Sequence, residues 1–228
     1  RILFKLFSHR FCMILSIIIP TINEEKSIGS TISNIHKRLK GVKHEIIVVD
    51  TNSTDNTRKI AMSLGARVIN EPRRGYGRAY KTGFRHVKGD VIVTLDADST
   101  YPVESIMKLV DKLKDADFVS GVRQRSEGMS LLHRFGNWSI TTCANVLFLK
   151  NFKDSQSGMW AFRKSLLKKM NLTNNSWPFS GEIKIEASRN GRFVEVPIIY
   201  RKRRGESKVR SWKVGIENIK FLTKKRFS

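Results

Sequence analysis

The sequence predicts an α/β fold with a mainly parallel central sheet and helices on both faces. The first observation is an alternation of short apolar runs with helical patterns, which is typical of parallel sheets covered on both sides. The apolar runs lie at 14–19, 45–49, 66–69 and 91–95, and the helical patterns lie at 24–39, 55–64, 75–86 and 103–113. The second observation is that polar or acidic residues follow these runs, at the sheet edge where such folds bind ligands.

The elements can be assigned in order along the chain. The alternation of strands and helices is regular in the first half and less regular in the second. Asn23 and Ser53 stand where polar residues open the first two helices. A fifth strand is expected at 117–120. After it the pattern indicates a helix, a strand, a helix and a strand, at 130–149, 159–162, 180–189 and 192–198. With 228 residues and no linker-like stretch, the chain fits one domain of ordinary size.

We expect a short lead-in, a main domain and a basic amphipathic helix, at residues 1–12, 13–210 and 211–228. On the last of these, Trp212, Ile216, Ile219 and Leu222 fall on one helical face. This apolar stripe fits a membrane interface, and it equally fits the surface of the domain itself. The sequence leaves both interpretations open.

The net charge of +23 indicates an anionic partner, whether nucleic acid, lipid or a phosphorylated small molecule. The charge is densest at 201–228, which carries 11 basic and 2 acidic side chains. With only Cys12 and Cys143, no disulfide framework is expected and a reducing compartment is the default. The apolar run at 11–19 has no cleavage site and is too short to span a bilayer, so we expect no secretory signal.

The most informative motif is Asp96-Ala97-Asp98, which directly follows the apolar run at 91–95. Two carboxylates one residue apart at the end of a strand suit Mg²⁺ or Mn²⁺, which take oxygen ligands and often substrate phosphates. Aspartates also start turns and cap helices, so the spacing alone leaves two interpretations. Thr21 and Asp50, after the first two strands, are expected to face the same crevice.

Three spaced segments resemble the family 2 glycosyltransferases of GT-A fold. They read IIIPTINE at 17–24, VVD and STDNT within 48–57, and LDAD at 95–98. Three further segments narrow the resemblance to the dolichol-phosphate (polyprenol-phosphate) mannose or glucose synthases, and these read DSQSG at 154–158, EVPI at 195–198 and GESK at 205–208. The resemblance extends over almost the whole chain, and it implies the GT-A nucleotide-diphospho-sugar transferase fold.

The resemblance also implies roles for individual residues. Pro20 and Glu24 match positions that hold the nucleotide's base and ribose, and Asp50 matches an acidic residue that contacts the base. The implied metal positions, for Mg²⁺ or Mn²⁺, are Asp96, Asp98 and Thr100. The implied catalytic positions are Asp98, Arg123 and Lys208. The implied nucleotide-sugar-binding residues are Pro20, Glu24, Val48, Asp50, Asp96, Ala97, Asp98, Thr100, Arg123, Lys202 and Lys208.

The implied reaction moves a hexose, mannose or glucose, from GDP-mannose or a UDP-hexose to a polyprenyl or dolichyl phosphate, with inversion. Because the acceptor oxygen is already anionic at neutral pH, no strong general base is required. Catalysis then depends on positioning and on neutralising the charge of both phosphates. The chain departs from the family pattern at Ile22, Thr51, Thr100 and Lys202, where relatives carry an aromatic residue, a second aspartate, glutamine or histidine, and arginine.

Other functions and roles stay open. A relative of this kind can instead glycosylate a saccharide hydroxyl, and Glu182 lies near the catalytic acid of such enzymes, although it also suits the first turn of a helix. Asp154 fits a contact to a sugar hydroxyl, an orienting role for an arginine, or a turn before Gly158. Arg134 is a candidate contact for the lipid phosphate. A nucleic-acid-binding domain fits the charge, yet no recognition helix or stacking platform is present, so no nucleic-acid partner is expected.

The implied acceptor predicts a peripheral protein on the cytoplasmic face of a membrane, in contact with an anionic lipid surface. Many relatives continue into transmembrane helices, whereas this sequence stops at Ser228. Three explanations stay open: a naturally short form, a truncated chain, or a chain that uses a membrane-anchoring subunit.

Overall fold

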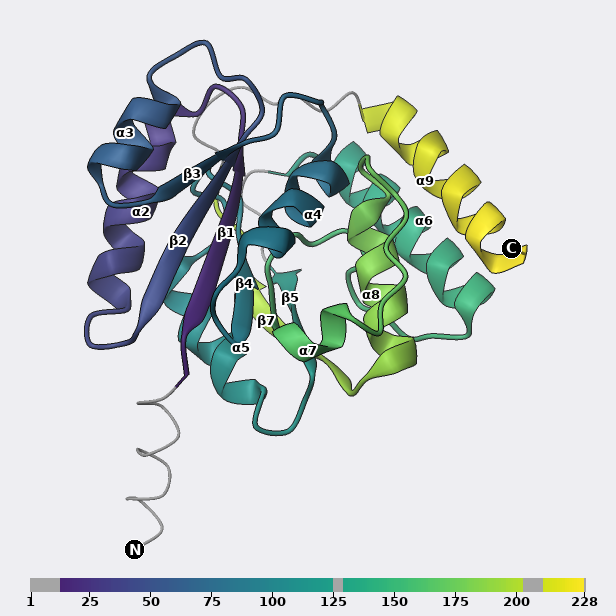
Figure 1. Cartoon of the computed structure of the whole chain (residues 1–228). Coiled ribbons are helices and arrows are strands. Elements are labelled where there is room, and N and C mark those ends of the chain that lie inside the picture. Colours follow the sequence, from purple (N-terminus) through teal and green to yellow (C-terminus); the bar gives the residue numbers. More distant parts are fainter. Residues whose placement is uncertain (1–12, 125–128, 203–210, 228) are drawn as a thin grey trace, which may run out of the picture.

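The centre of the molecule is a seven-stranded sheet (Figure 1), in a computed structural model that describes residues 13–124, 129–202 and 211–227. The strands are β1 (Leu15–Thr21), β2 (His44–Asp50), β3 (Arg67–Asn70), β4 (Val91–Thr94), β5 (Phe118–Gln124), β6 (Trp160–Arg163) and β7 (Phe193–Ile199). Their order across the sheet is β3-β2-β1-β4-β6-β5-β7. All neighbours pair in parallel except β6, which is antiparallel to both β4 and β5. The predicted α/β architecture is confirmed.

Helices cover both faces of this sheet. They are α2 (Glu25–Arg38), α3 (Thr57–Ser63), α4 (Tyr76–His86), the 3-10 turn η1 (Val103–Ser105), α5 (Ile106–Lys112), α6 (Leu131–Phe148), α7 (Lys164–Leu167), α8 (Phe179–Asn190) and α9 (Ser211–Phe227). One core cluster joins the sheet to α2 and α5, and a second joins the other face to α4 and α8. In α2, Ile28, Ile32 and Ile35 recur at helical spacing and are fully buried. Because they lie on one face of the helix, these side chains pack α2 against β1.

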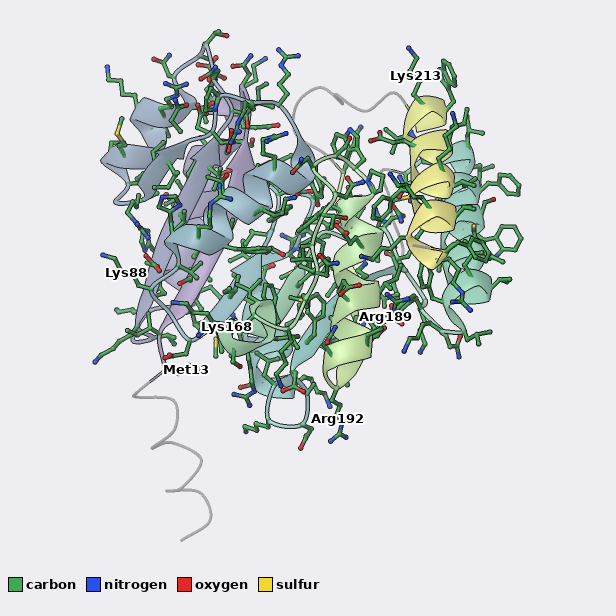
Figure 2. The ribbon with its side chains drawn as sticks, turned by 45° about the vertical axis from the view of Figure 1, so that its right-hand side comes forward. Met13, Lys88, Lys168, Arg189, Arg192 and Lys213 are labelled. Carbon is green, nitrogen blue, oxygen red and sulfur yellow. The ribbon has the colours of Figure 1, made fainter. Side chains whose placement is uncertain are left out.

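A third layer lies outside α8 and consists of α6 and α9. The two helices run side by side at one edge of the molecule, with Lys213 near the start of α9 (Figure 2). Ile140, Phe148, Ile185 and Leu222 are among the residues that form the core between them and α8. Because α8 is covered on both sides, its whole first half is buried.

Two of the sequence-based elements differ in the structure, and the short helix α7 was not predicted. The fifth strand does not stop at residue 120 but continues to Gln124, because all of its residues pair with β7. The predicted helix at 103–113 divides into η1 and α5, since the chain makes a separate tight turn after Pro102. Pro197 is accommodated within β7 because this strand lies at the edge of the sheet.

Candidate active site

A cavity of about 760 Å³ opens where the chain leaves β1 and β4. This is the carboxyl-terminal edge of the parallel strands, and the volume is that of a small-ligand site. It is lined by Pro20, Thr21, Ile22, Asn23, Glu24, Thr51, Arg74, Gly75, Tyr76, Ala79, Asp96, Ala97, Asp98, Tyr101, Arg123, Asn137, Gln156, Ser176, Trp177, Ser180, Tyr200 and Val214. We call it the first cavity.

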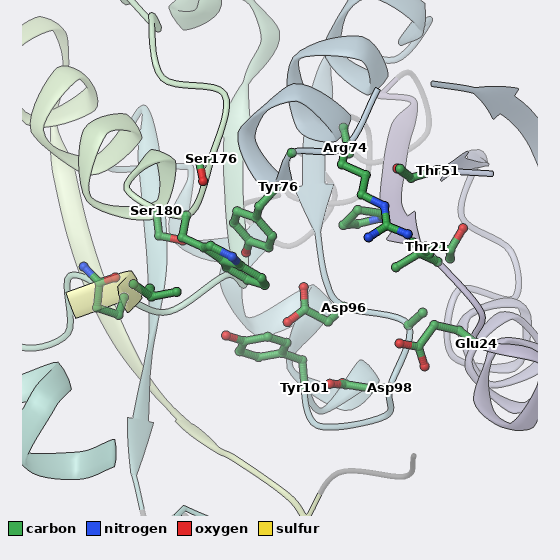
Figure 3. Close-up of a pocket in the computed structure, with 18 of the residues that line it drawn as sticks. Thr21, Glu24, Thr51, Arg74, Tyr76, Asp96, Asp98, Tyr101, Ser176 and Ser180 are labelled. Carbon is green, nitrogen blue, oxygen red and sulfur yellow. The ribbon is translucent and has the colours of Figure 1, made fainter. Parts of the chain in front are cut away.

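Asp96 and Asp98 stand at the centre of this cavity (Figure 3). The hydroxyl of Tyr80 donates to Oδ1 of Asp96 at 3.3 Å. Oδ1 of Asp98 accepts from the backbone N of Thr100 at 3.0 Å and from its hydroxyl at 2.6 Å. Ser99, between Asp98 and Thr100, has a φ of +63°, and both aspartates line the cavity. The Thr100 hydroxyl orients Asp98 and does not itself line the cavity.

Tyrosine side chains surround the Asp96 carboxylate. Burial raises the pKa of Tyr80 and of Tyr101 well above the ordinary value, and the negative charge of Asp96 adds to the rise. These phenols therefore stay protonated and remain available as donors. Gly158 lets the Tyr76 hydroxyl approach its backbone closely, because a Cβ at this position would lie 2.5 Å from the Tyr76 hydroxyl oxygen. Its backbone N instead donates to the hydroxyl oxygen of Tyr101 at 2.6 Å.

Arg123 enters the cavity from the end of β5 and is held by Asp154. Its Nε lies 2.7 Å from Oδ2 of Asp154 and its Nη2 lies 2.9 Å from Oδ1, a bidentate pair in which each side chain is 10% exposed. Burial alone would raise the pKa of Asp154, but the Arg123 guanidinium outweighs it and holds that pKa below its usual range. Of the roles open for Asp154, the structure favours the orientation of an arginine.

Lys184 supports the Asp154 segment from α8. Its Nζ donates to the backbone O of Asp154 at 2.6 Å, and the side chain is fully buried. Burial lowers the pKa of Lys184 to about 7, while the nearby Asp154 carboxylate acts in the opposite direction. Glu195, on β7, accepts from the backbone N atoms of Lys153 and Asp154. Asp154 is thus fixed from both the helix and the sheet.

A second cavity, of about 700 Å³, adjoins the first and shares Arg123 and Asn137 with it. It lies between α6 and the segment around Asp154. Its lining consists of Arg123, Met129, Arg134, Asn137, Trp138, Thr141, Thr142, Asn145, Phe152, Lys153 and Asp154. Arg123 therefore stands between two cavities, one that contains the acidic pair and one that contains further basic residues.

Several predicted site residues lie elsewhere. Val48 packs in the hydrophobic core, because it is an interior residue of β2 with a neighbouring strand on each side. Asp50 is fully buried and outside the lining, where it accepts from Ser53 and forms an ion pair with Arg58. Lys202 is exposed and outside the lining. Lys208 lies outside the described residues. Thr100 does not line the first cavity either. The other predicted positions do line it, and these are Pro20, Glu24, Asp96, Ala97, Asp98 and Arg123.

Glu182 does not line the cavity either. It is fully buried, and its two oxygens accept from the backbone N atoms of Thr173 and Asn174 at 2.9 Å each. It also pairs with Lys225 of α9. A carboxylate with these partners has a structural role. Glu182 is therefore not placed to act as the catalytic acid on which the interpretation as a saccharide-hydroxyl transferase depended.

Sequence reasoning missed part of the cavity wall, chiefly Arg74, Tyr76, Trp177 and Tyr200. Arg74 and Tyr76 follow β3, so the rule that placed Asp50 and Asp96 at strand ends could also have found them. Tyr200 directly follows β7, so the same rule could have found it, whereas Trp177 comes from an irregular segment that no motif marks. Trp177 stacks on Tyr76 with ring centroids 4.9 Å apart and an interplanar angle of 20°.

Within residues 13–124, 129–202 and 211–227, no three histidine, cysteine, aspartate or glutamate side chains gather into a metal site. Nor does any helix of the described part have both the length and the apolar character needed to cross a bilayer.

The chain is similar in sequence to known glycosyltransferases. The model of glycosyl transferase family 2 matches residues 16–170. The dolichyl-phosphate hexose transferase of Haloferax volcanii is 38% identical over 199 residues, which is 86% of each chain. The dolichol-phosphate mannosyltransferase of Pyrococcus furiosus is 33% identical over 211 residues, and the match covers 87% of this chain but only 60% of that protein.

A similar fold is found in glucosyl-3-phosphoglycerate synthase from Mycobacterium tuberculosis, solved with Mn²⁺, UDP-glucose and phosphoglyceric acid. The TM-score is 0.79 at 20% identity, with 98% of this chain and 83% of that chain covered. The same enzyme was also solved with Mg²⁺ and UDP, and that structure has a TM-score of 0.73. At this identity the likeness shows the fold alone.

Proposed function

The chain belongs to glycosyltransferase family 2, and on that premise we propose that it transfers a hexose from a nucleotide sugar to a dolichyl or polyprenyl phosphate with inversion. Mannose and glucose are the favoured hexoses, and GDP-mannose or a UDP-hexose the favoured donors. The similarity to two proteins named for dolichyl or dolichol phosphate supports this acceptor. The two cavities that meet at Arg123 supply the structural argument.

The observation that carries the proposal is the place of Arg123. It lines both cavities, and Asp154 fixes its guanidinium by two hydrogen bonds. Transfer between two phosphates requires a cation where their negative charges approach each other, and a guanidinium binds phosphate oxygens in pairs. We assign the nucleotide sugar to the first cavity and the acceptor phosphate to the second, with Arg123 between them.

The acidic pair fits a divalent cation. Asp96 and Asp98 are the only two acidic residues on this turn, and a Mg²⁺ or Mn²⁺ site of two carboxylates is completed by phosphate oxygens of the ligand. When bound, the ion supplies positive charge to the leaving nucleoside diphosphate. Tyr80 and the Thr100 hydroxyl keep the two carboxylates in place. Thr100 is then a positioning residue for Asp98, rather than the direct ligand suggested by the sequence.

The acceptor side needs no general base. A phosphate oxygen is already anionic at neutral pH, and Glu182 is buried away from both cavities. The second cavity instead offers Arg134 and Lys153 in addition to Arg123. Their positive charges suit an acceptor phosphate, because they can hold it at the attacking position and partly neutralise its charge.

The location of these cavities supports a peripheral membrane contact. Exposed apolar side chains lie on the first halves of α6 and α9, and they are Leu131, Leu132, Phe135, Trp138, Trp212 and Ile216. The same halves supply Asn137 and Val214 to the first cavity. Lys213 and Arg134 are exposed on these helices as well. We propose that this surface, the α6/α9 face, lies on an anionic lipid surface, so that a lipid acceptor reaches the second cavity from the membrane.

The direct test is a donor screen with purified protein, Mg²⁺ or Mn²⁺ and a short polyprenyl phosphate, in which the lipid product is identified by mass spectrometry. One GDP- or UDP-hexose should give a lipid-linked sugar. With that donor, Asp98→Asn should lower kcat/KM by about a hundredfold or more, because it removes charge from the leaving-group site.

Asp115→Asn is the matched control, since it removes an exposed carboxylate of the loop between α5 and β5 and should leave the rate unchanged. The proposal fails if no donor gives a lipid product. It also fails if Asp98→Asn and Asp115→Asn transfer sugar at the same rate.

A further inference from the structure

A buried ion cluster joins α9 to the catalytic domain. Nζ of Lys225 lies 3.2 Å from Oε1 of Glu182 and 3.1 Å from Oε1 of Glu186, and these three side chains are 9%, 0% and 6% exposed. Glu182 and Glu186 are one turn apart on α8, so their carboxylates repel each other in a poorly solvated place. Lys225 supplies positive charge from α9, and the half-exposed Arg189 of α8 pairs with Oε1 of Glu186 at 3.3 Å. Its neighbours Lys224 and Arg226 are exposed.

The same two carboxylates hold the segment that precedes α8. Oε2 of Glu186 accepts from the backbone N of Asn171 at 2.9 Å. Glu182 accepts from the backbone N atoms of Thr173 and Asn174, and from the Thr173 hydroxyl at 2.8 Å. Lys225 itself donates to the backbone O of Asn171 at 3.2 Å. The conformation of residues 171–174 therefore depends on all three charged side chains.

Residues 171–174 lead directly into the wall of the first cavity. Ser176 and Trp177 line it, and Trp177 stacks on Tyr76. The packing leaves little room for adjustment, because a Cβ on Gly77 would lie 2.8 Å from the backbone O of Asn174. A displacement of the segment must therefore move the wall or the start of α4.

This wall is at one end of the cavity. In Figure 3, Ser176, Ser180 and Tyr76 lie on one side of Asp96, whereas Thr21 and Glu24 lie on the other. If the nucleotide occupies the end near Thr21 and Glu24, and its diphosphate lies at Asp96, the hexose extends toward Tyr76 and Trp177. The segment held by Lys225 would then border the sugar and not the nucleotide.

We propose that Lys225 is a positioning residue that sets the sugar end of the donor cavity, so that correct docking of α9 is required for hexose binding and transfer. This inference rests on the proposed use of a nucleotide sugar, but not on the identity of the acceptor. It assigns to the last helix a role in the active site, transmitted through Glu182, Glu186 and residues 171–177.

The test compares two ligands in the presence of Mn²⁺ by calorimetry: the nucleotide sugar and the corresponding nucleoside diphosphate, for both the GDP and UDP series. Lys225→Met should weaken binding of the nucleotide sugar by about tenfold, with the nucleoside diphosphate nearly unaffected, because only the sugar end is displaced. Lys225→Arg should restore the affinity, since it keeps the charge. Lys224→Met, the same change at an exposed neighbour, is the matched control.

Glu186→Gln adds a rescue test. In the Lys225→Met background it removes one of the two carboxylates that face the position of Lys225, and it keeps an oxygen for Asn171, so it should recover part of the loss. Equal weakening of both ligands, or no difference between Lys225→Met and Lys224→Met, overturns the inference. If Lys225→Met does not fold, the double variant gives the same comparison. A wild-type protein that binds the nucleotide sugar yet transfers nothing to lipid phosphate contradicts only the proposed acceptor.

Discussion

At the scale of single residues, the paired charges of Arg123 and Asp154 hold the point where the two cavities meet. Both side chains are nearly buried, and each satisfies the other through two short hydrogen bonds. Removal of one member of such a pair leaves an uncompensated charge in a poorly solvated place. The pair is therefore coupled both to stability and to the position of the guanidinium.

Asp154→Asn should accordingly lower kcat/KM for sugar transfer by about a hundredfold, because the Arg123 guanidinium loses its fixed orientation. It should also lower the free energy of unfolding by about 3 kcal/mol, as expected when one partner of a buried ion pair is removed. Steady-state kinetics and urea unfolding measure the two effects. Glu104→Gln, which breaks the exposed ion pair to Arg201, is the control and should change neither quantity appreciably. Unchanged kinetics in folded Asp154→Asn would show that Arg123 needs no such support.

At the scale of elements, the segment from β3 to the first residue of α4 brings Arg74 and Tyr76 to the cavity, and Glu71 forms hydrogen bonds that hold it. Hydrogen bonds from Arg73 lower the pKa of Glu71 to about 2 against the opposing effect of burial, and a bond from the Thr82 hydroxyl contributes further. A depressed carboxylate pKa means that the folded protein gains stability while the group is ionised. This gain is complete above the unfolded value of 4.5 and is lost as the pH falls toward about 2.

Glu71→Gln should therefore lower Tm at neutral pH, and the difference from wild type should shrink steadily as the pH falls from 4.5 toward about 2. Thermal unfolding followed by circular dichroism at a series of pH values checks this. Glu104→Gln again serves as the control, because an exposed pair contributes roughly 0 to 1 kcal/mol at any of these pH values. A Tm difference that stays constant with pH would assign the effect of Glu71 to packing and not to its charge.

Some strands, helices and site residues of this molecule can be predicted from the sequence, and others cannot. The first four strands and their helices follow from local apolar patterns, and the rule that ligands bind at strand ends predicts the edge of the sheet where Asp96 and Asp98 line the first cavity. The antiparallel insertion of β6 between β4 and β5 depends on long-range pairing, which no local pattern records. Asp50 illustrates the limit for single residues, because its charge is evident in the sequence but its partner Arg58 is not.

The helix at the end of the chain shows the same limit. The stripe of Trp212, Ile216, Ile219 and Leu222 was compatible with either a membrane or the domain, and the structure divides it. Leu222 is buried against the domain, whereas the other three side chains are exposed. Periodicity identifies an apolar face, but only the packed neighbours determine which part of that face is already covered.

At the scale of the whole molecule, the outer layer of α6 and α9 leaves apolar side chains beside the openings of both cavities. Leu131 is 80% and Leu132 is 74% exposed, and Trp212 of α9 is 68% exposed. Exposed apolar residues that gather on one face, with basic residues among them, are typical of an interfacial surface. The charge of the chain, +23, would add attraction to anionic lipids.

The whole protein should therefore float with liposomes that contain anionic lipid, and less so with neutral liposomes or at high salt, which screens the charges. Leu131→Ser combined with Leu132→Ser should weaken this binding, because each leucine contributes about 1 to 2 kcal/mol when it leaves water, or roughly five- to thirtyfold in the partition constant. Met62→Ser is the matched control, since Met62 is 57% exposed on α3, outside the α6/α9 face. If the leucine variant and Met62→Ser float equally well, the α6/α9 face is not the surface that meets the membrane, and the lipid acceptor must reach Arg123 by another route.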